Sequence, residues 1–192
     1  MELVGALAEI LAPKGLQRGP SLELREDQKG SRCEPIAVRA PGEVLALRLG
    51  HDDWARQLAE LPKDRSVRRL PDYLLFGAPS RRDAQRGLRL KVVVCEIKSS
   101  QTGSEAALPR VRLGHLLARY LVSLAALHLK ESTPSEGAVL YGAVIALPSA
   151  LYHRGETKPG RGNRGGEAVD PIAHIPIKHV SGGGEIDLDL HC

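Results

Sequence analysis

A glutamate and a lysine separated by one residue stand at the end of a strongly apolar segment. Lys91–Ser100 opens with Lys-Val-Val-Val-Cys and continues with Glu96-Ile97-Lys98. Because successive side chains of a strand point to opposite faces, we expect Glu96 and Lys98 on one face, with the Ile97 carbonyl between them. Two other acid-x-lysine triplets, at 27–29 and 156–158, fall in a predicted turn and a glycine-rich loop. Nothing there fixes side-chain geometry, so the triplet at Glu96 is the candidate for chemistry.

A second carboxylate comes from the preceding apolar segment. Asp72 follows Pro71 in the one Pro-Asp pair of the chain and opens the predicted strand Asp72–Gly77, 24 positions before Glu96. Pairing of the two segments as a hairpin would bring the carboxylates together near one end of a sheet. Charges at the end of a buried strand are costly unless they are compensated. A Glu96–Lys98 ion pair and a divalent cation between the carboxylates are the two candidate compensations.

The elements that must position these residues alternate between helix and strand patterns. The strongest helix pattern is followed by an apolar strand, and strand-helix-strand is a crossover that implies parallel pairing in an α/β fold. The arginine-rich loop Ala78–Arg89 joins the two strands of the predicted hairpin. The other predicted elements are a helix over Glu2–Leu11, strand and turn material over Ser21–Gly50, a short helix over His51–Leu61, a long helix over Pro109–Lys130, a strand over Ala138–Leu147, a mobile loop over His153–Gly166 that contacts nucleic acid, and a terminal hairpin formed by Ile172–Val180 and Glu185–Leu190.

Composition places further limits on the fold and the class of protein. The chain has 192 residues, 42% of them hydrophobic, which suits one globular domain with a real core. It has no uninterrupted apolar run of about 18 residues and no basic leader, which predicts a cytoplasmic protein without a membrane partner. Three dispersed cysteines argue against a disulfide scaffold and a thiolate zinc site.

Positive charge is concentrated in one part of the chain. The segment Leu61–Lys91 contains nine basic and three acidic residues, whereas the whole chain has a net charge of +4. A polyanionic partner and an ordinary solvated arginine-rich loop both account for this pattern. Arg81, Arg82 and Arg86 are the candidates for nucleic-acid contact in it.

The order of these motifs resembles a known family. Pro71-Asp72, then Glu96-Ile97-Lys98 on the next strand, a long amphipathic helix and another strand are similar to the PD-(D/E)XK nuclease superfamily, over roughly residues 1–147. The resemblance implies a restriction-endonuclease-like fold, in which helices flank a central mixed β-sheet. In this chain we expect one domain over 1–192, with a β-rich insertion after the first helix and the terminal hairpin.

The resemblance also implies roles for individual residues. Asp72 and Glu96 would ligate Mg²⁺ or Mn²⁺, hard cations that prefer oxygen ligands, and the Ile97 carbonyl would add a third ligand. Lys98 would activate the attacking water. Members of the superfamily often carry a further acid on the first helix, for which Glu9 is the candidate.

The implied function is metal-dependent hydrolysis of nucleic-acid phosphodiester bonds, with DNA favoured over RNA. The alternative is a catalytically inactive nucleic-acid-binding or assembly subunit that keeps the fold. By analogy we expect a homodimer or a subunit of a larger defence or repair complex. Arg112, His115 and Arg119 form a basic stripe on the long helix, which would contact phosphate or simply be solvated, and Gln101 is a further candidate for nucleic-acid contact.

Overall fold

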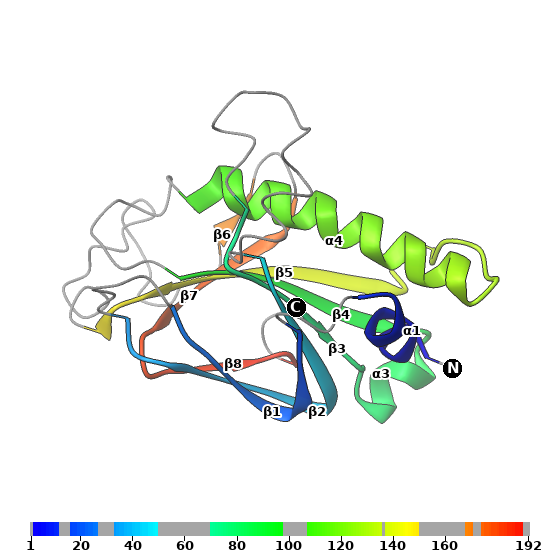
Figure 1. The fold of residues 1–192 in the computed structure, drawn as a ribbon, viewed down its shortest axis with the longest axis horizontal. Helices are drawn as coiled ribbons and strands as arrows, with labels where there is room; N and C mark the ends of the chain where they lie inside the picture. Colours follow the sequence, from blue (N-terminus) through cyan, green and yellow to red (C-terminus); the bar gives the residue numbers. More distant parts are fainter. Residues whose placement is uncertain are drawn as a thin grey trace.

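The protein is built on a mixed β-sheet, and its first helix and its long helix pack on one face of the sheet (Figure 1). The computed structural model describes residues 2–11, 16–26, 33–49, 70–97, 107–135, 137–149, 168–170 and 174–189. Its elements are α1 (Leu3–Ile10), β1 (Leu16–Leu24), β2 (Ile36–Arg48), β3 (Tyr73–Gly77), α3 (Arg81–Gln85), β4 (Leu90–Ile97), α4 (Leu108–His128), β5 (Val139–Leu147), β6 (Ala168–Val169), β7 (Pro176–Ser181) and β8 (Glu185–Asp187).

Seven strands pair in the order β1-β2-β3-β4-β5-β7-β6, and β8 pairs with β2 outside this path. The first half of the order is an antiparallel meander from β1 to β4. The pairs β4–β5 and β5–β7 are parallel, because α4 carries the chain back across the sheet between β4 and β5. The predicted hairpin and the predicted crossover are therefore confirmed, as is the mixed α/β class.

Two apolar cores cover the two faces of this sheet. Helices α1 and α4 pack on one face, where Leu7, Phe76 and Val92 belong to the larger core. On the other face, β1, β8 and the first half of β2 contribute to a smaller core, in which Ile36 and Ile186 pack with residues of β3 and β4. Strand β4 is buried along its whole length because both of its faces are covered. None of the helices in the described residues has the length and apolarity needed to cross a membrane.

The structure corrects two predictions about local elements. The expected terminal hairpin is wrong: β7 joins the sheet beside β5, and β8 runs parallel to β2 at Ala37–Arg39. Ile186 and Leu188 are buried in the smaller core, and this burial accounts for the separation of the two strands. The arginine-rich loop also contains a short helix, α3, which Ser80 caps by accepting a hydrogen bond from the Asp83 amide. The predicted helix at 51–61 and the predicted loop at 153–166 lie outside the described residues.

The long helix is where it was predicted, but its buried face is different. The sequence suggested that its leucines face the core, yet Leu116, Tyr120 and Leu127 are about 60% exposed or more. The side chains that face the sheet are mostly small, because α4 approaches it closely. A Cβ atom at Gly114 would stand 2.6 Å from Pro71 Cγ and 2.7 Å from Val94 Cγ1. The buried residues of α4 are Val111, Gly114, His115, Ala118, Leu121, Val122, Ala125 and Ala126.

Candidate functional site

Asp72 and Glu96 lie together at one end of the β3–β4 hairpin. Tyr73 pairs with Cys95 in the antiparallel register, and one step further sets Asp72 opposite Glu96. Directly opposed residues of an antiparallel pair share a face. That face is the one covered by α4, since Arg110 of α4 donates to Glu96 Oε1 at 2.5 Å. The structure thus brings together the two carboxylates that the sequence singled out.

The electrostatics of the pair reflect two acids in a small buried volume. Glu96 is fully buried and Asp72 is partly buried. Burial raises the pKa of Asp72 to about 7, and the charge of Glu96 adds to this increase. The Ile97 amide donates to Asp72 Oδ2 at 2.6 Å, and this bond and the charge of Arg110 lower the pKa of Asp72 by less than burial and Glu96 raise it. The site therefore favours additional positive charge.

Arg110 and Glu26 lie close enough to the pair to affect its charges, but the sequence did not indicate either residue as part of the site. Arg110 occupies the first turn of α4 and forms an ion pair with Glu96. Glu26 follows β1, and its charge also raises the pKa of Asp72. The Tyr73 hydroxyl donates to the Arg25 carbonyl at 2.8 Å, which holds the end of the β1 segment beside β3. The rotation of α4 determines the position of Arg110, and the path of the chain after β1 determines that of Glu26. Neither feature can be predicted from a local sequence pattern.

The described residues could offer a divalent cation two carboxylates, those of Asp72 and Glu96. In the described part of the chain, no group of three or more His, Cys, Asp or Glu side chains is arranged to hold a metal ion. Mg²⁺ commonly uses only one or two protein carboxylates and completes its coordination with water and substrate oxygens. The raised pKa of Asp72 is the observation that matches such an ion, because a cation would relieve the repulsion between the acids.

Glu9 does not join this pair. Its Oε2 atom lies 2.9 Å from His128 Nε2, whereas Arg110 contacts Glu96. These two residues of α4 are 18 positions apart, which corresponds to about 27 Å along a helix. Glu9 thus packs at the opposite end of α4 from Asp72, and its suggested role as a further ligand is corrected. Lys98 and Gln101 lie outside the described residues.

Some of the basic residues proposed to contact nucleic acid are exposed, and others are bound to an acidic residue or line a cavity. Arg81, Arg82 and Arg86 are exposed on or beside α3, and none of them forms an ion pair with another described residue. Arg112 is held by the buried Asp170, whose carboxylate oxygens lie 2.9 and 3.2 Å from Arg112 Nε. Arg119 lines a cavity beside β5. The expected basic stripe on α4 is therefore not a uniform solvated face.

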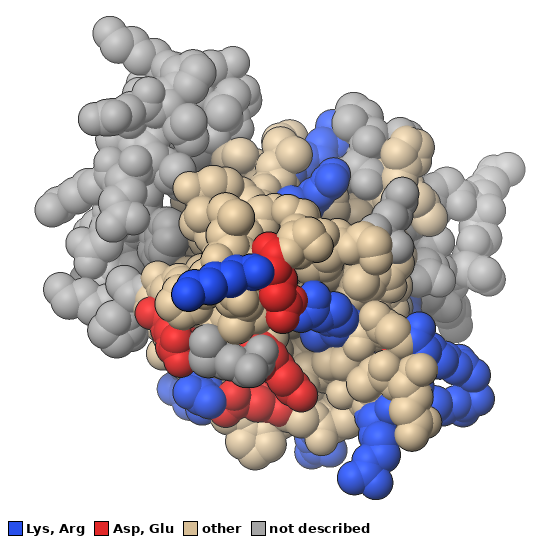
Figure 2. All heavy atoms as spheres, turned by 90° about the vertical axis from the view of Figure 1, so that its right-hand side faces the viewer, with Lys and Arg blue, Asp and Glu red and all other residues tan. Residues whose placement is uncertain are grey.

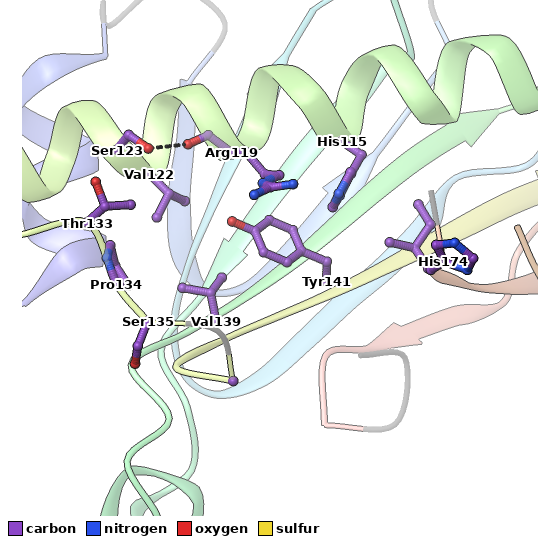
Figure 3. A pocket seen from close by; sticks show the side chains of 12 residues that line it. His115, Arg119, Val122, Ser123, Thr133, Pro134, Ser135, Val139, Tyr141 and His174 are labelled. Atoms are coloured by element: carbon purple, nitrogen blue, oxygen red, sulfur yellow. Dashed lines mark hydrogen bonds between the residues drawn. The ribbon is translucent and has the colours of Figure 1, made fainter. Parts of the chain in front are cut away.

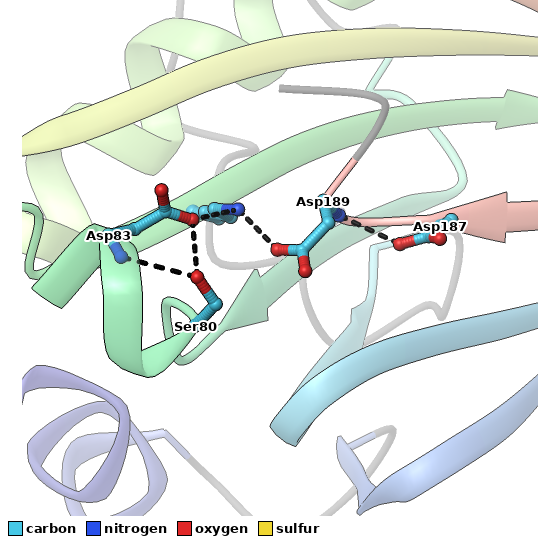
Figure 4. A network of polar contacts seen from close by, with 5 residues as sticks. Ser80, Asp83, Asp187 and Asp189 are labelled. Carbon is cyan, nitrogen blue, oxygen red and sulfur yellow. Dashed lines mark hydrogen bonds and ion pairs between the residues drawn. The ribbon is translucent and has the colours of Figure 1, made fainter.

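Lys91, which was counted in the basic segment, is buried and faces the other side of the sheet. Its side chain is only 3% exposed and binds both Asp83, at 3.0 Å, and Asp189 (Figure 4). Burial alone would lower the pKa of Lys91, but the hydrogen bonds to Asp189 and Asp83 raise it. Lys91 is thus not available to a polyanion.

The surface around α1 and α3 carries both signs of charge. Figure 2 shows acidic side chains among the lysines and arginines on the face that corresponds to the right-hand side of Figure 1. A mixed surface steers a polyanion less strongly than a continuous basic one. Any contact with phosphates here would depend on the exposed arginines of α3.

Comparisons with known protein families, with curated proteins and with solved structures found no match to this chain. The family resemblance noted in the sequence thus depends on the motifs and their order alone.

Proposed function

We propose that this protein is a metal-dependent nuclease that hydrolyses phosphodiester bonds of nucleic acid, with DNA favoured over RNA. The observation that carries the proposal is the opposed pair Asp72 and Glu96, with the pKa of Asp72 raised by burial and by its neighbour. An antiparallel hairpin, a long helix and a parallel strand follow in the order that the restriction-endonuclease-like fold would require.

In this proposal each residue has a defined task. Asp72 and Glu96 would hold Mg²⁺ or Mn²⁺, with the Ile97 carbonyl as a further oxygen. Such an ion, when bound, polarises the scissile phosphate and lowers the pKa of a coordinated water. The Ile97 amide orients the Asp72 carboxylate through its 2.6 Å hydrogen bond. Lys98 would hold the attacking water and stabilise negative charge that develops on the phosphate.

One observation favours the alternative of an inactive nucleic-acid-binding or assembly subunit. Arg110 already supplies a positive charge to Glu96, at 2.5 Å, and so occupies one of the two carboxylates that the ion would need. A site in which the arginine has replaced the cation would keep the fold but not the chemistry. In the nuclease, Arg110 would either release Glu96 when the ion binds or keep one oxygen of Glu96 while the other ligates the ion.

Cleavage assays separate the two functions. The purified chain is incubated with single-stranded, duplex and branched DNA and with RNA, with Mg²⁺, Mn²⁺ or EDTA. We expect cleavage that requires the ion and that falls by about a hundredfold or more in D72N, E96Q and K98A. D83N is the matched control, because Asp83 belongs to the Lys91 cluster. An inactive wild-type protein that still binds DNA but not Mn²⁺ would support the alternative.

The contribution of α3 to binding is tested separately by charge reversal. We expect that changing Arg81, Arg82 and Arg86 to Glu weakens DNA affinity and reduces its dependence on salt, because fewer counterions are released. The control is R39E, since Arg39 is exposed on β2 and pairs with Glu185. An unchanged salt slope in the triple variant would exclude α3 from the interface. The expectation of a homodimer or larger complex stays a prediction, which light scattering can address.

A further inference from the structure

A cavity of about 540 Å³ lies between the middle of α4, the segment before β5 with the start of β5, and the segment at His174–Ile175 (Figure 3). Its middle is formed by His115, Arg119 and Tyr141. The cavity is separate from the carboxylate pair, because Tyr141 pairs with Val92, four residues before Glu96 on β4. Four residues correspond to about 13 Å along a strand. The volume falls within the usual range of small-molecule sites.

His115 is a buried polar side chain whose bonding capacity is not used. It is 8% exposed, and its Nδ1 atom has no hydrogen-bond partner in the described part of the protein. Its ring packs edge-on against Tyr141, with 4.8 Å between the ring centroids and an interplanar angle of 82°. Leaving a buried nitrogen without a partner is costly. Because this Nδ1 atom is itself buried, His115 contributes to the cavity wall through its ring.

Arg119 and Tyr141 present two more polar groups to the same place. Figure 3 shows the Arg119 guanidinium beside the Tyr141 ring, on the side of the cavity where His115 descends from α4. Burial lowers the pKa of His115, and the charge of Arg119 lowers it further. Burial raises the pKa of Tyr141, and the charge of Arg119 opposes this increase. Within the described residues, the guanidinium has no carboxylate partner and the Tyr141 hydroxyl forms no hydrogen bond. Arg119 and Tyr141 therefore offer two donors to one place that no other described residue uses.

None of the described residues that line the cavity is acidic, so no carboxylate among them balances the positive charge of Arg119. The charge of Asp170 does reach His115 and raises its pKa, but Arg112 holds this carboxylate with its Nε atom. Since burial and Arg119 outweigh Asp170, the pKa of His115 is lowered and the imidazole is neutral at neutral pH. A neutral imidazole can donate to or accept from a ligand.

The remainder of the wall is mixed: it contains the hydroxyl groups of Ser123, Thr133 and Ser135 and four apolar side chains. Val122, Val139, Pro134 and Ile175 line the cavity around its polar centre. An anionic group at Arg119 would leave the rest of a ligand in contact with these side chains. Sites with a few convergent polar groups and apolar walls are typical of small organic ligands.

We propose that this cavity binds a small organic anion, with its phosphate or carboxylate group on Arg119 and the Tyr141 hydroxyl and its ring or aliphatic portion against Val122, Val139 and Ile175. The inference does not depend on the nuclease proposal. It assigns Arg119 to a ligand site, whereas the sequence offered it as a contact for nucleic acid.

The test uses phenyl phosphate and benzoate as probes, with benzyl alcohol as the neutral control. Binding is followed by the chemical shifts of the His115 ring in the full chain, assigned with H115Q, and by calorimetry. We expect one or both anions to bind and to shift the His115 signals, and benzyl alcohol to bind about tenfold more weakly or not at all, since it lacks charge-assisted hydrogen bonds. The stronger of the two anions identifies the acidic group.

Variants decide whether the cavity is the site. R119Q and Y141F should each weaken binding of the anion by about tenfold, while R81Q, on α3, should leave the affinity for the anion unchanged. Arg119 is exposed, so R119Q keeps the test valid even if H115Q does not fold. Equal binding of the neutral control, anion binding unaffected by R119Q, or His115 shifts with an oligonucleotide but with neither small anion would each overturn the proposal.

Discussion

Strand β4 carries a charged cluster near each end, and each cluster contains two carboxylates and one cation. Near its start, Lys91 lies between Asp83 and Asp189, so the cation is buried and the acids are about one-third exposed. At its end, Asp72 and Glu96 are adjacent and the cation, Arg110, is attached to one of them from the side. The pKa shifts follow this difference: the pKa of Asp83 is lowered by hydrogen bonds from Lys91 and Ser80, whereas that of Asp72 is raised.

The Lys91 cluster stabilises the fold, whereas the Asp72–Glu96 pair is held in place by the fold. A central cation satisfies both of its acids, and the Lys91 cluster ties the C-terminal segment after β8 to α3. Two adjacent acids with a peripheral cation are compact only because neighbouring elements force them together. Perturbed carboxyl pairs of the second kind are frequent at functional sites.

The largest expected effect is the loss of the central cation. We expect K91M to lower the free energy of unfolding by about 3 kcal/mol, because removing one partner of a buried ion pair leaves the other partners unsatisfied. Urea unfolding monitored by circular dichroism measures this change. Adding D83N and D189N to K91M should recover part of the loss. An unchanged unfolding midpoint for K91M would mean that this cluster is not structural.

A substitution at the other end of β4, at Asp72, is expected to raise the free energy of unfolding instead of lowering it. An acid whose pKa is raised in the folded protein binds more protons folded than unfolded, so its contribution to stability falls as the pH rises from about 4 to about 7. Replacing Asp72 by Asn removes this fall, and Asn can still accept the Ile97 hydrogen bond. Without divalent cations, we expect D72N to be more stable than wild type at pH 7.5, by on the order of 2 kcal/mol, and the gain to vanish near pH 4.

The quantity to measure is the difference between D72N and wild type in urea unfolding at several pH values. The lowered pKa values of His115 and His179 act in the other direction, since these side chains favour the unfolded state as the pH falls below about 6.5. They are present in both proteins and cancel in the difference. A D72N protein that is less stable than wild type at pH 7.5 would contradict the raised pKa of Asp72.

A smaller effect is expected for the peripheral cation. R110Q should cost about 1 kcal/mol of stability at pH 7.5, because Arg110 is one-quarter exposed and pairs with only one of the two acids. The same change should strengthen Mn²⁺ binding several-fold by ending the competition for Glu96. Calorimetric titration with Mn²⁺ tests this, with R112Q as a control on the same helix. Weaker Mn²⁺ binding in R110Q would show that Arg110 supports the ion rather than competes with it.

The smallest effect should follow the loss of one acid from the Lys91 cluster. D83N should destabilise the protein less than K91M does, since Lys91 keeps Asp189 as its partner. The Asn side chain can still accept a hydrogen bond from Ser80, and the Ser80 cap of α3 uses the backbone amide of residue 83. Unfolding of D83N and K91M under the same conditions decides the order. A loss for D83N equal to that for K91M would mean that Asp83 alone satisfies the lysine.

The carboxylate pair was predictable because it depends on local geometry. Strand alternation and a hairpin between segments 24 positions apart are enough to oppose Asp72 and Glu96. The rotation of α4 was not predictable from its leucines, because they form one stripe whereas the helix buries a neighbouring face of mostly small residues, and so Arg110 was missed. The pairing partner of β8 could not be predicted from the sequence pattern either. Its pairing with β2 joins segments that are far apart in the sequence and depends on the burial of Ile186 in the smaller core.

The absence of a side chain at Gly114 has a consequence for the detection of relatives. Pro71 and Val94 fill the space where its Cβ would stand, and each of them lies one or two residues from an acid of the pair. Arg110, one helical turn before Gly114, reaches Glu96 from this close approach. A search pattern that joins Pro71-Asp72, Val94-x-Glu96 and Arg110-x-x-x-Gly114 therefore encodes three touching segments instead of one short motif. Sequences that keep all three segments should share this site even where overall identity is too low to align.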